Sequence, residues 1–303
     1  MEIETAASLI SRGTERLVLS GGVPPTEYDR MRAPLQEGDF PFPVKYGYAA
    51  AGTVIDGPAE RIGQQVFALA PHQDRLRIPG EMALPLPEGV PPGRAVLAAN
   101  IETALNAVWD AEDWPGIGPG TRVLVVGLGL VGLLILRVLG DRGGLTLGTV
   151  DLLPQRRTLA ERFSGTFSLP HEIVRSSDLD GWDIAFHTSA SAAGLSTALG
   201  ALRFEGTVIE CSWFGAEPVP VPLGAAFHSR RLTIKSSQVG HVARSRRAVT
   251  RHADRLAQAL ELARDDRLDA LVTEEIAFSD LPDATPRLFA EGADGIATRI
   301  VYR

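Results

Sequence analysis

The chain has 303 residues, of which 45% are hydrophobic and 22% charged, and a formal net charge of −7. These values are ordinary for a soluble globular protein of one large or two medium domains, and the acidic balance argues against a nucleic-acid partner, which would favour a basic face. The single cysteine, Cys211, excludes an internal disulfide and any cysteine-rich zinc site. It lies in an apolar run, so we expect a buried, inert thiol.

Nothing in the sequence predicts contact with a membrane. No apolar run reaches the roughly 18 residues that a spanning helix needs. The acidic N-terminus also lacks the basic segment of a signal peptide. We therefore expect a cytoplasmic protein without a membrane partner.

The first 95 residues are rich in Pro and Gly and hold short strand-like runs separated by turn signals, which predicts an irregular β region. These runs lie at residues 17–19, 53–55 and 66–69. A helix is predicted from residue 100 to 109, because apolar residues recur there at helical spacing.

A glycine-rich turn, Gly-Leu-Gly-Leu-Val-Gly, occupies residues 127–132 between a strand pattern at 123–126 and an apolar helix pattern. Gly127 permits the tight turn, Gly129 lets the backbone approach a pyrophosphate, and Gly132 lets the helix pack closely on the strand. Leu130 and Val131 begin the helix, whose free N–H groups and partial positive charge favour phosphates. The turn therefore predicts a dinucleotide site.

An acidic residue, Asp151, ends the next strand pattern at residues 145–150. A carboxylate there accepts hydrogen bonds from ribose hydroxyls and repels a 2′-phosphate, which favours NAD(H) over NADP(H). Arg156 and Arg157 follow closely and weaken this preference, because they could face an adenine, a phosphate or solvent.

Strands and helices alternate through the rest of this region, which predicts a parallel sheet covered on both faces. Strands are expected at 183–186, 206–211 and 232–235, a helix at 192–202 and a surface helix at 247–264. Ligands bind at the carboxyl ends of parallel strands, so further cofactor contacts are expected after these strands. The expected contact residues are Thr188, Ser189, Trp213 and Ser237. Trp213 could instead serve packing alone.

The order of a β-rich lobe, a nucleotide fold and a short return to the first lobe resembles the medium-chain dehydrogenase/reductase superfamily. Similar segments lie at 11–15, 47–54, 63–67 and 295–301. The resemblance implies an α/β protein with a doubly wound Rossmann domain at 105–264 and a GroES-like catalytic lobe at 1–104 and 265–303. It also implies a homodimer, and a phosphate contact from Arg299.

The positions that hold zinc in many members of this superfamily are changed. Arg12 stands where the first ligand cysteine would be, Tyr48 replaces the histidine, and the third position falls near Ala99. The four-cysteine structural loop is absent as well. The stretch Ser-Arg-Gly-Thr-Glu at 11–15 is similar to a zinc-less branch, and we therefore predict no metal.

Members of the superfamily usually open with an extra strand pair before the segment that 11–15 resembles, whereas this chain begins almost at that segment. We expect either a shortened start or a lobe that manages without the pair.

Without zinc, hydrogen-bond donors must polarise a carbonyl. The resemblance places five candidates in the cleft: Thr14, Tyr48, His72, Asn100 and Glu102.

A structural role is open for several of these candidates. Thr14 could bond a turn, Tyr48 could pack beside Tyr46, Asn100 could cap a helix, and His72 could lie on an exposed loop. Arg12 and Glu15 are expected to form a structural ion pair.

The leading hypothesis is a metal-independent, NAD(H)-linked oxidoreductase that transfers a hydride between nicotinamide and an alcohol or carbonyl substrate. A quinone- or enoyl-type reductase of C=C bonds is the alternative within the enzyme class. A dinucleotide-binding protein without catalysis is the alternative outside it.

Overall fold

The computed structural model describes residues 1–173, 180–290 and 292–302. The chain separates into two compact units: residues 1–99 with 256–303 form the first unit, and residues 100–255 form the second unit. The domain boundaries expected from the sequence, after residues 104 and 264, lie further along the chain than these divisions after residues 99 and 255.

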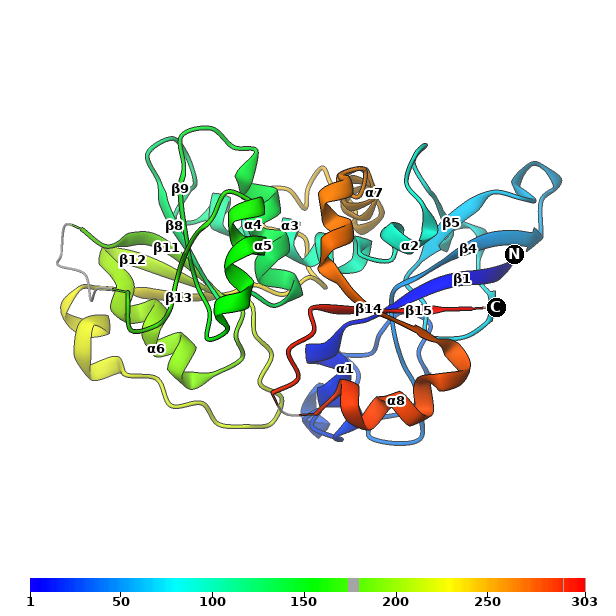
Figure 1. The fold of residues 1–303 in the computed structure, drawn as a ribbon, viewed down its shortest axis with the longest axis horizontal. Coiled ribbons are helices and arrows are strands. Elements are labelled where there is room, and N and C mark those ends of the chain that lie inside the picture. The colour runs from blue at the N-terminus through cyan, green and yellow to red at the C-terminus, as the bar shows by residue number, and fades with distance from the viewer. Residues whose placement is uncertain (174–179, 291, 303) are drawn as a thin grey trace. The chain divides into compact units, whose positions relative to one another are not determined.

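The first unit is built on a mixed sheet (Figure 1). In the described residues its strands follow the order β14-β15-β1-β4-β5-β7, with β6 also paired to β1, and β2 pairs with β3 separately. The bounds are β1 Glu2–Ile10, β2 Glu37–Gly38, β3 Val44–Lys45, β4 Ala50–Asp56, β5 Gln65–Ala68, β6 Arg75–Arg77, β7 Leu84–Pro85, β14 Val272–Ala277 and β15 Ala297–Val301. β1 has an antiparallel neighbour on each side, β15 and β4.

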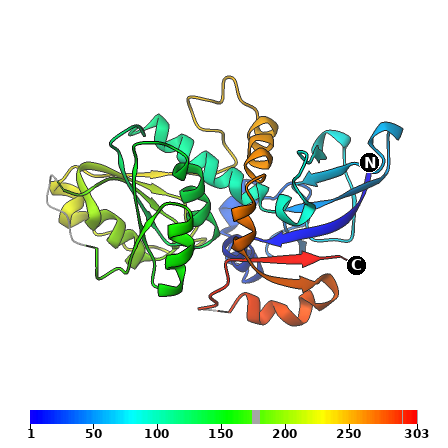
Figure 2. The same ribbon diagram turned by 45° about the horizontal axis from the view of Figure 1, so that its top comes forward.

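Two apolar clusters hold the first unit together. One gathers residues of β1, β4, β5 and β6, including Ile3, Val54 and Leu76. The other packs helix α8 (Leu281–Leu288) against β1 and β15 through Leu288, Ile10 and Ile300. Figure 2 shows α8 beside these strands.

A helix, α1 (Arg12–Leu19), replaces the strand predicted at 17–19. A helix forms here rather than a strand because its first turn is capped. The Glu15 carboxylate accepts the backbone N–H of Ser11, the residue before the helix, at 2.7 Å. Only Val18 of the three apolar residues is buried. A short helix, α2 (Pro92–Ala95), also interrupts the region that was expected to be all β.

The second unit contains the predicted parallel sheet. In the described residues it has six strands in the order β10-β9-β8-β11-β12-β13, all parallel, which confirms the doubly wound α/β fold. The bounds are β8 Arg122–Val126, β9 Thr146–Val150, β10 Thr166–Ser168, β11 Trp182–His187, β12 Leu202–Glu210 and β13 Thr233–Ser236. The order reverses between β8 and β11, so the crossovers leave these two strands in opposite directions.

Helices cover this sheet, as Figure 1 shows. α4 (Leu130–Gly140) and α5 (Arg157–Arg162) follow β8 and β9, and α6 (Ala192–Ala201) follows β11. Leu195, Ala198 and Leu199 of α6 pack on Leu124 and Val126 of β8. α3 (Ala98–Asp113) contains the helix predicted at 100–109.

Two local predictions need correction. The helix expected at 247–264 is α7 (His252–Leu262), which starts later because the Asp254 carboxylate accepts the N–H of Arg251 and ends the preceding turns there. Cys211 is partly exposed rather than buried. Its surroundings still raise the pKa of the thiol, mainly by desolvation, so the thiol stays protonated and unreactive at neutral pH.

Within the described residues, no helix is long and apolar enough to cross a membrane.

Candidate functional site

The glycine-rich turn connects β8 to α4 with the geometry that its sequence predicts. Gly127 has φ +99°, and a Cβ there would lie 2.7 Å from the backbone nitrogen of Ser189. A Cβ on Gly132 would lie 2.0 Å from the carbonyl oxygen of Gly127. Gly129 differs, because no described atom lies within 4 Å of its Cβ position. Two glycines thus permit close packing, and the middle one leaves open space beside the turn.

Asp151 is bonded to this turn. One carboxylate oxygen accepts the N–H of Leu128 at 2.6 Å, and the other accepts the N–H of Leu153 at 2.9 Å. α4 begins at Leu130 without a side-chain cap, and among the described residues nothing accepts the N–H groups of Leu130 and Val131. The two N–H groups can bind a phosphate. The partly exposed Asp151 carboxylate beside them can accept hydrogen bonds from a ribose.

The two arginines after Asp151 are not simply solvated. Arg156 is only 7% exposed, which removes the solvent-facing alternative for its side chain. Arg157 lies over the Phe167 ring at 4.7 Å from the ring centroid.

Of the cofactor contacts predicted at strand ends, Thr188 and Ser189 lie beside the glycine-rich turn, whereas Ser237 is bonded to α3. The Thr188 hydroxyl donates to the Gly127 carbonyl at 2.6 Å, and Ser189 lies against Gly127. The Ser237 hydroxyl instead donates to Asp110 of α3 at 2.7 Å. Trp213 is partly exposed after β12.

An acid–histidine–serine chain stands at the same sheet edge and was missed by the sequence analysis. The Glu210 carboxylate lies 2.6 Å from His187 Nδ1, and His187 Nε2 lies 2.7 Å from Ser189 Oγ. His187 is fully buried, whereas Ser189 is exposed. His187 and Glu210 end neighbouring strands in direct register. Comparing the last residues of adjacent predicted strands could have found the pair.

The first unit gathers hydroxyl groups around Tyr48. The side chains of Ser11 and Thr14, at the start of α1, lie beside the phenol and act to lower its pKa. Desolvation, with a contribution from the nearby Glu15 carboxylate, raises the pKa of Tyr48 to about 12. The ring also meets Tyr46 edge-on, with 6.0 Å between centroids. Tyr48 is therefore both a packing residue and a protonated hydroxyl.

A second polar chain lies near this phenol. Glu15 is 3.0 Å from His72 Nε2, and Ser8 Oγ is 2.8 Å from both His72 Nδ1 and the Tyr302 hydroxyl. A Cβ on Gly47 would lie 2.9 Å from the His72 ring, so this glycine makes room for the histidine. His72 is thus held on both ring nitrogens and is not on a freely exposed loop. Ser8 and Tyr302 were not predicted.

The prediction of an ion pair between Arg12 and Glu15 is wrong. Arg12 donates to the carbonyls of Ala293 and Gly295, at 2.7 and 2.9 Å, while Glu15 bonds Ser11 and His72. Residues three apart on a helix can meet, but here each of the two side chains has other partners.

Asn100 and Glu102 belong to the second unit, whereas Thr14, Tyr48 and His72 belong to the first. Asn100 is buried inside α3 and does not cap it. Glu102 forms a buried ion pair with Arg255 at 2.9 Å, and burial raises its pKa while the guanidinium opposes that rise. The carboxylate of Glu102 therefore has a structural partner.

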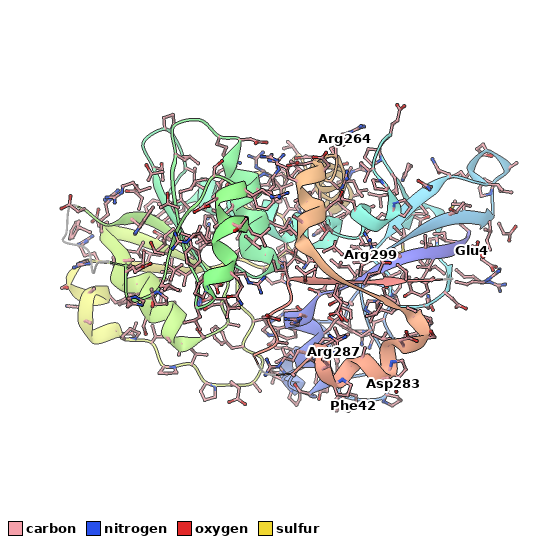
Figure 3. The ribbon with its side chains drawn as sticks, viewed as in Figure 1. Glu4, Phe42, Arg264, Asp283, Arg287 and Arg299 are labelled. Carbon is pink, nitrogen blue, oxygen red and sulfur yellow. The ribbon has the colours of Figure 1, made fainter. Side chains whose placement is uncertain are left out.

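Arg299 lies on β15, where Figure 3 labels it. Its guanidinium donates to Glu275 at 2.5 Å and to the Gly93 carbonyl at 3.0 Å. It lines a groove of about 650 Å³ in the first unit, together with the ion pair between Arg94 and Asp269. Its contact with a phosphate stays a prediction.

Curated relatives match part of the chain. A probable zinc-binding alcohol dehydrogenase of Mycobacterium tuberculosis is 28% identical over 231 residues, covering 61% of this chain and 59% of its own length. (R,R)-butanediol dehydrogenase of Saccharomyces cerevisiae is 25% identical over 206 residues, covering 65% of this chain and 48% of its own length. The matches thus span about half to three-fifths of these relatives, and no protein-family model matches.

The fold has close counterparts among solved structures. 2R,3R-butanediol dehydrogenase from Bacillus subtilis superposes with a TM-score of 0.73 at 16% identity, covering 99% of this chain and 91% of that one. In fold, this chain is therefore similar to alcohol dehydrogenases. Two further structures with this fold are a Sinorhizobium meliloti putative zinc-binding dehydrogenase bound to NADP (TM-score 0.74, 16% identity, 99% and 91% coverage) and an Escherichia coli alcohol dehydrogenase complexed with NADH (TM-score 0.72, 14% identity, 99% and 91% coverage).

The residues of this chain do not fit the zinc that the names of several relatives indicate. The superfamily resemblance matches two zinc-ligand positions to Arg12 and Tyr48 and a third to the chain near Ala99, and none of these side chains is a usual zinc ligand. In the described ranges, no group of three His, Cys, Asp or Glu side chains could hold a metal ion.

Proposed function

We propose that the protein is a metal-independent, NAD(H)-linked oxidoreductase that acts on an alcohol/carbonyl pair. The observation that carries this proposal is the hydroxyl cluster of Tyr48, Thr14 and Ser11, at the segments where related dehydrogenases carry zinc ligands. The chain is alcohol dehydrogenase-like in sequence and fold, which supports the reaction class.

The second unit fits a nicotinamide dinucleotide. The open space at Gly129 and the free N–H groups of Leu130 and Val131 suit a pyrophosphate. Asp151 is held by two backbone N–H groups with its carboxylate partly exposed, which suits a ribose 2′-hydroxyl and supports NAD(H) over NADP(H). Thr188, Ser189 and Trp213 stay proposed cofactor contacts, as does Arg299.

The bound nicotinamide supplies or accepts the hydride. Tyr48 would donate a hydrogen bond to the substrate oxygen, and Thr14 and Ser11 would hold the phenol in place. Removing one such donor from an acyl-transfer site costs about 10²–10³-fold in rate, so a hydroxyl can carry substantial charge stabilisation.

His72 and Glu15 complete the proposed machinery as positioning residues. Their contact, with Ser8 on the other ring nitrogen, fixes the position of the Glu15 carboxylate within the first unit. We propose that this chain keeps the buried Glu15 carboxylate paired, so that the field at Tyr48 stays constant during turnover.

We further propose a homodimer, as the superfamily resemblance implies. β13 is an edge strand of the parallel sheet in the described residues, so its outer backbone groups are available for pairing.

The test is NADH consumption across aldehydes, ketones, quinones and enones. Turnover of aldehydes or ketones supports the proposal, and turnover confined to quinones or enones favours C=C reduction. NADH binding without any turnover would sink both enzyme hypotheses for that panel.

A further inference from the structure

The chain formed by Glu210, His187 and Ser189 has the parts of an activated serine, and it does not depend on the proposed dehydrogenase function. An ionised carboxylate only accepts hydrogen bonds, so His187 Nδ1 donates to Glu210 at 2.6 Å. In a neutral imidazole this leaves Nε2 as the acceptor, and Ser189 Oγ donates to it at 2.7 Å. The histidine is thus in the tautomer that can remove the serine proton.

Further contacts hold the carboxylate and the imidazole in place. The second oxygen of Glu210 accepts the N–H of Ser212 at 2.8 Å, which fixes the carboxylate. His187 is fully buried and stacks on Phe214 at 6.3 Å between centroids. Ser189 is exposed at the end of β11, so a ligand can reach its oxygen.

Hydrogen-bond donors for a developing oxyanion lie near the serine. α6 begins at Ala192, three residues after Ser189, and Ser191 caps it by accepting the N–H of Gly194. No acceptor in the described part of the chain is bonded to the N–H groups of Ala192 or Ala193. They are the groups that would stabilise negative charge beside Ser189.

We propose that Ser189 is a nucleophile toward small activated acyl esters, with His187 as its general base and Glu210 as the positioning residue. Ser189 Oγ attacks the ester carbonyl carbon while its proton passes to His187 Nε2. The carbonyl–oxygen bond to the leaving alcohol breaks, and that alcohol takes the proton. Water then hydrolyses the seryl ester with His187 as base again, giving the acid and free Ser189.

Gly194 provides a sharp structural test. A Cβ at this position would lie 2.1 Å from Ser189 Oγ and 2.9 Å from His187 Nε2. Gly194→Ala therefore displaces the hydroxyl from the histidine, keeps all three functional residues, and places a good helix former in α6.

The experiment treats the full chain with an alkyl fluorophosphonate and reads intact mass and the modified peptide, alongside p-nitrophenyl acetate hydrolysis. Wild type should gain one adduct, at Ser189, and Ser189→Ala should gain none. Glu210→Gln should label roughly 10⁴-fold more slowly, by the scale of the carboxylate-to-amide variant of a serine triad. Gly194→Ala should lose labelling too.

Thr197→Ala is the matched control, because it removes a hydroxyl of the same helix that donates to the Ala193 carbonyl at 3.0 Å rather than to Ser189 or His187. It should label at the wild-type rate. Circular dichroism of each variant confirms that it is folded. The proposal is overturned if the folded wild type takes no adduct, if the adduct is elsewhere, or if Gly194→Ala labels as fast as wild type.

Discussion

At the scale of single residues, Tyr48 and Asp151 carry the proposed chemistry. The side chains of Ser11 and Thr14 lie beside the Tyr48 phenol, and the Asp151 carboxylate accepts two backbone N–H groups. The phenol stays protonated because its surroundings disfavour the charged form.

Replacing Tyr48 with phenylalanine removes the proposed donor and leaves the ring packing in place. We expect kcat/KM to fall roughly 10²–10³-fold, the scale of one lost oxyanion donor, with NADH affinity unchanged. Steady-state kinetics measure kcat/KM, and fluorescence titration measures the NADH affinity. Tyr46→Phe is the control and should keep its activity. An equal loss in both variants would show that packing, rather than the Tyr48 hydroxyl, matters.

Alkaline stability should also depend on Tyr48. Its pKa is about 12 in the folded chain against 10.0 ordinarily, so between these values the folded state keeps a proton that the unfolded state loses. Stability contributed below pH 10 is therefore lost as the pH rises toward 12. Tyr302, also near 12, adds to the same trend. In urea unfolding at pH 9 to 11, Tyr48→Phe should show a shallower decline than wild type, and parallel curves would refute this.

Asp151→Gly should weaken NADH binding and relax discrimination against NADPH, because the ribose acceptor and the bond to Leu128 N are both lost. Asp151→Asn is the matched variant, since it keeps one acceptor without the charge and should mainly relax discrimination. Dissociation constants for both cofactors measure this. An unchanged preference in both variants would refute the cofactor argument.

At the scale of elements, the sequence predicted the helices and strands that have a regular local pattern. It missed the features that depend on contacts between particular side chains. The turn at 127–132, α3 and the parallel strands follow from glycine spacing and apolar periodicity. α1 was missed because its capping by Glu15 competes with a strand-like apolar run. The resemblance named Thr14, Tyr48 and His72 as candidates, whereas Ser8, Tyr302 and His187 were missed because they have partners 23 to 294 residues away.

We expect the buried ion pair between Arg255 and Glu102 to be the main polar contact that stabilises the attachment of residue 255 to α3. Arg255 also donates to Asn106 and to the Val239 carbonyl. Arg255→Met leaves the Glu102 carboxylate buried and unpaired, and should cost about 3–5 kcal/mol of unfolding free energy. The double variant with Glu102→Leu should recover much of that loss. Urea denaturation measures both, and a double variant no more stable than the single one would contradict this account.

At the scale of the whole molecule, strand alternation predicted an α/β chain, because this signal accumulates over many residues, whereas the division into two units was implied by the superfamily resemblance. Light scattering tests the proposed homodimer, for which we expect twice the 32.4 kDa chain mass. A monomeric mass at working concentration would reject it.

The central claim is hydride transfer without a metal. The most direct measurement pairs elemental analysis with NADH oxidation by an accepted aldehyde or ketone, before and after exhaustive chelation. We predict no stoichiometric zinc and an unchanged rate, because the Tyr48 hydroxyl and its partners stabilise the substrate oxygen. A rate that disappears on chelation and returns with added zinc would contradict the account.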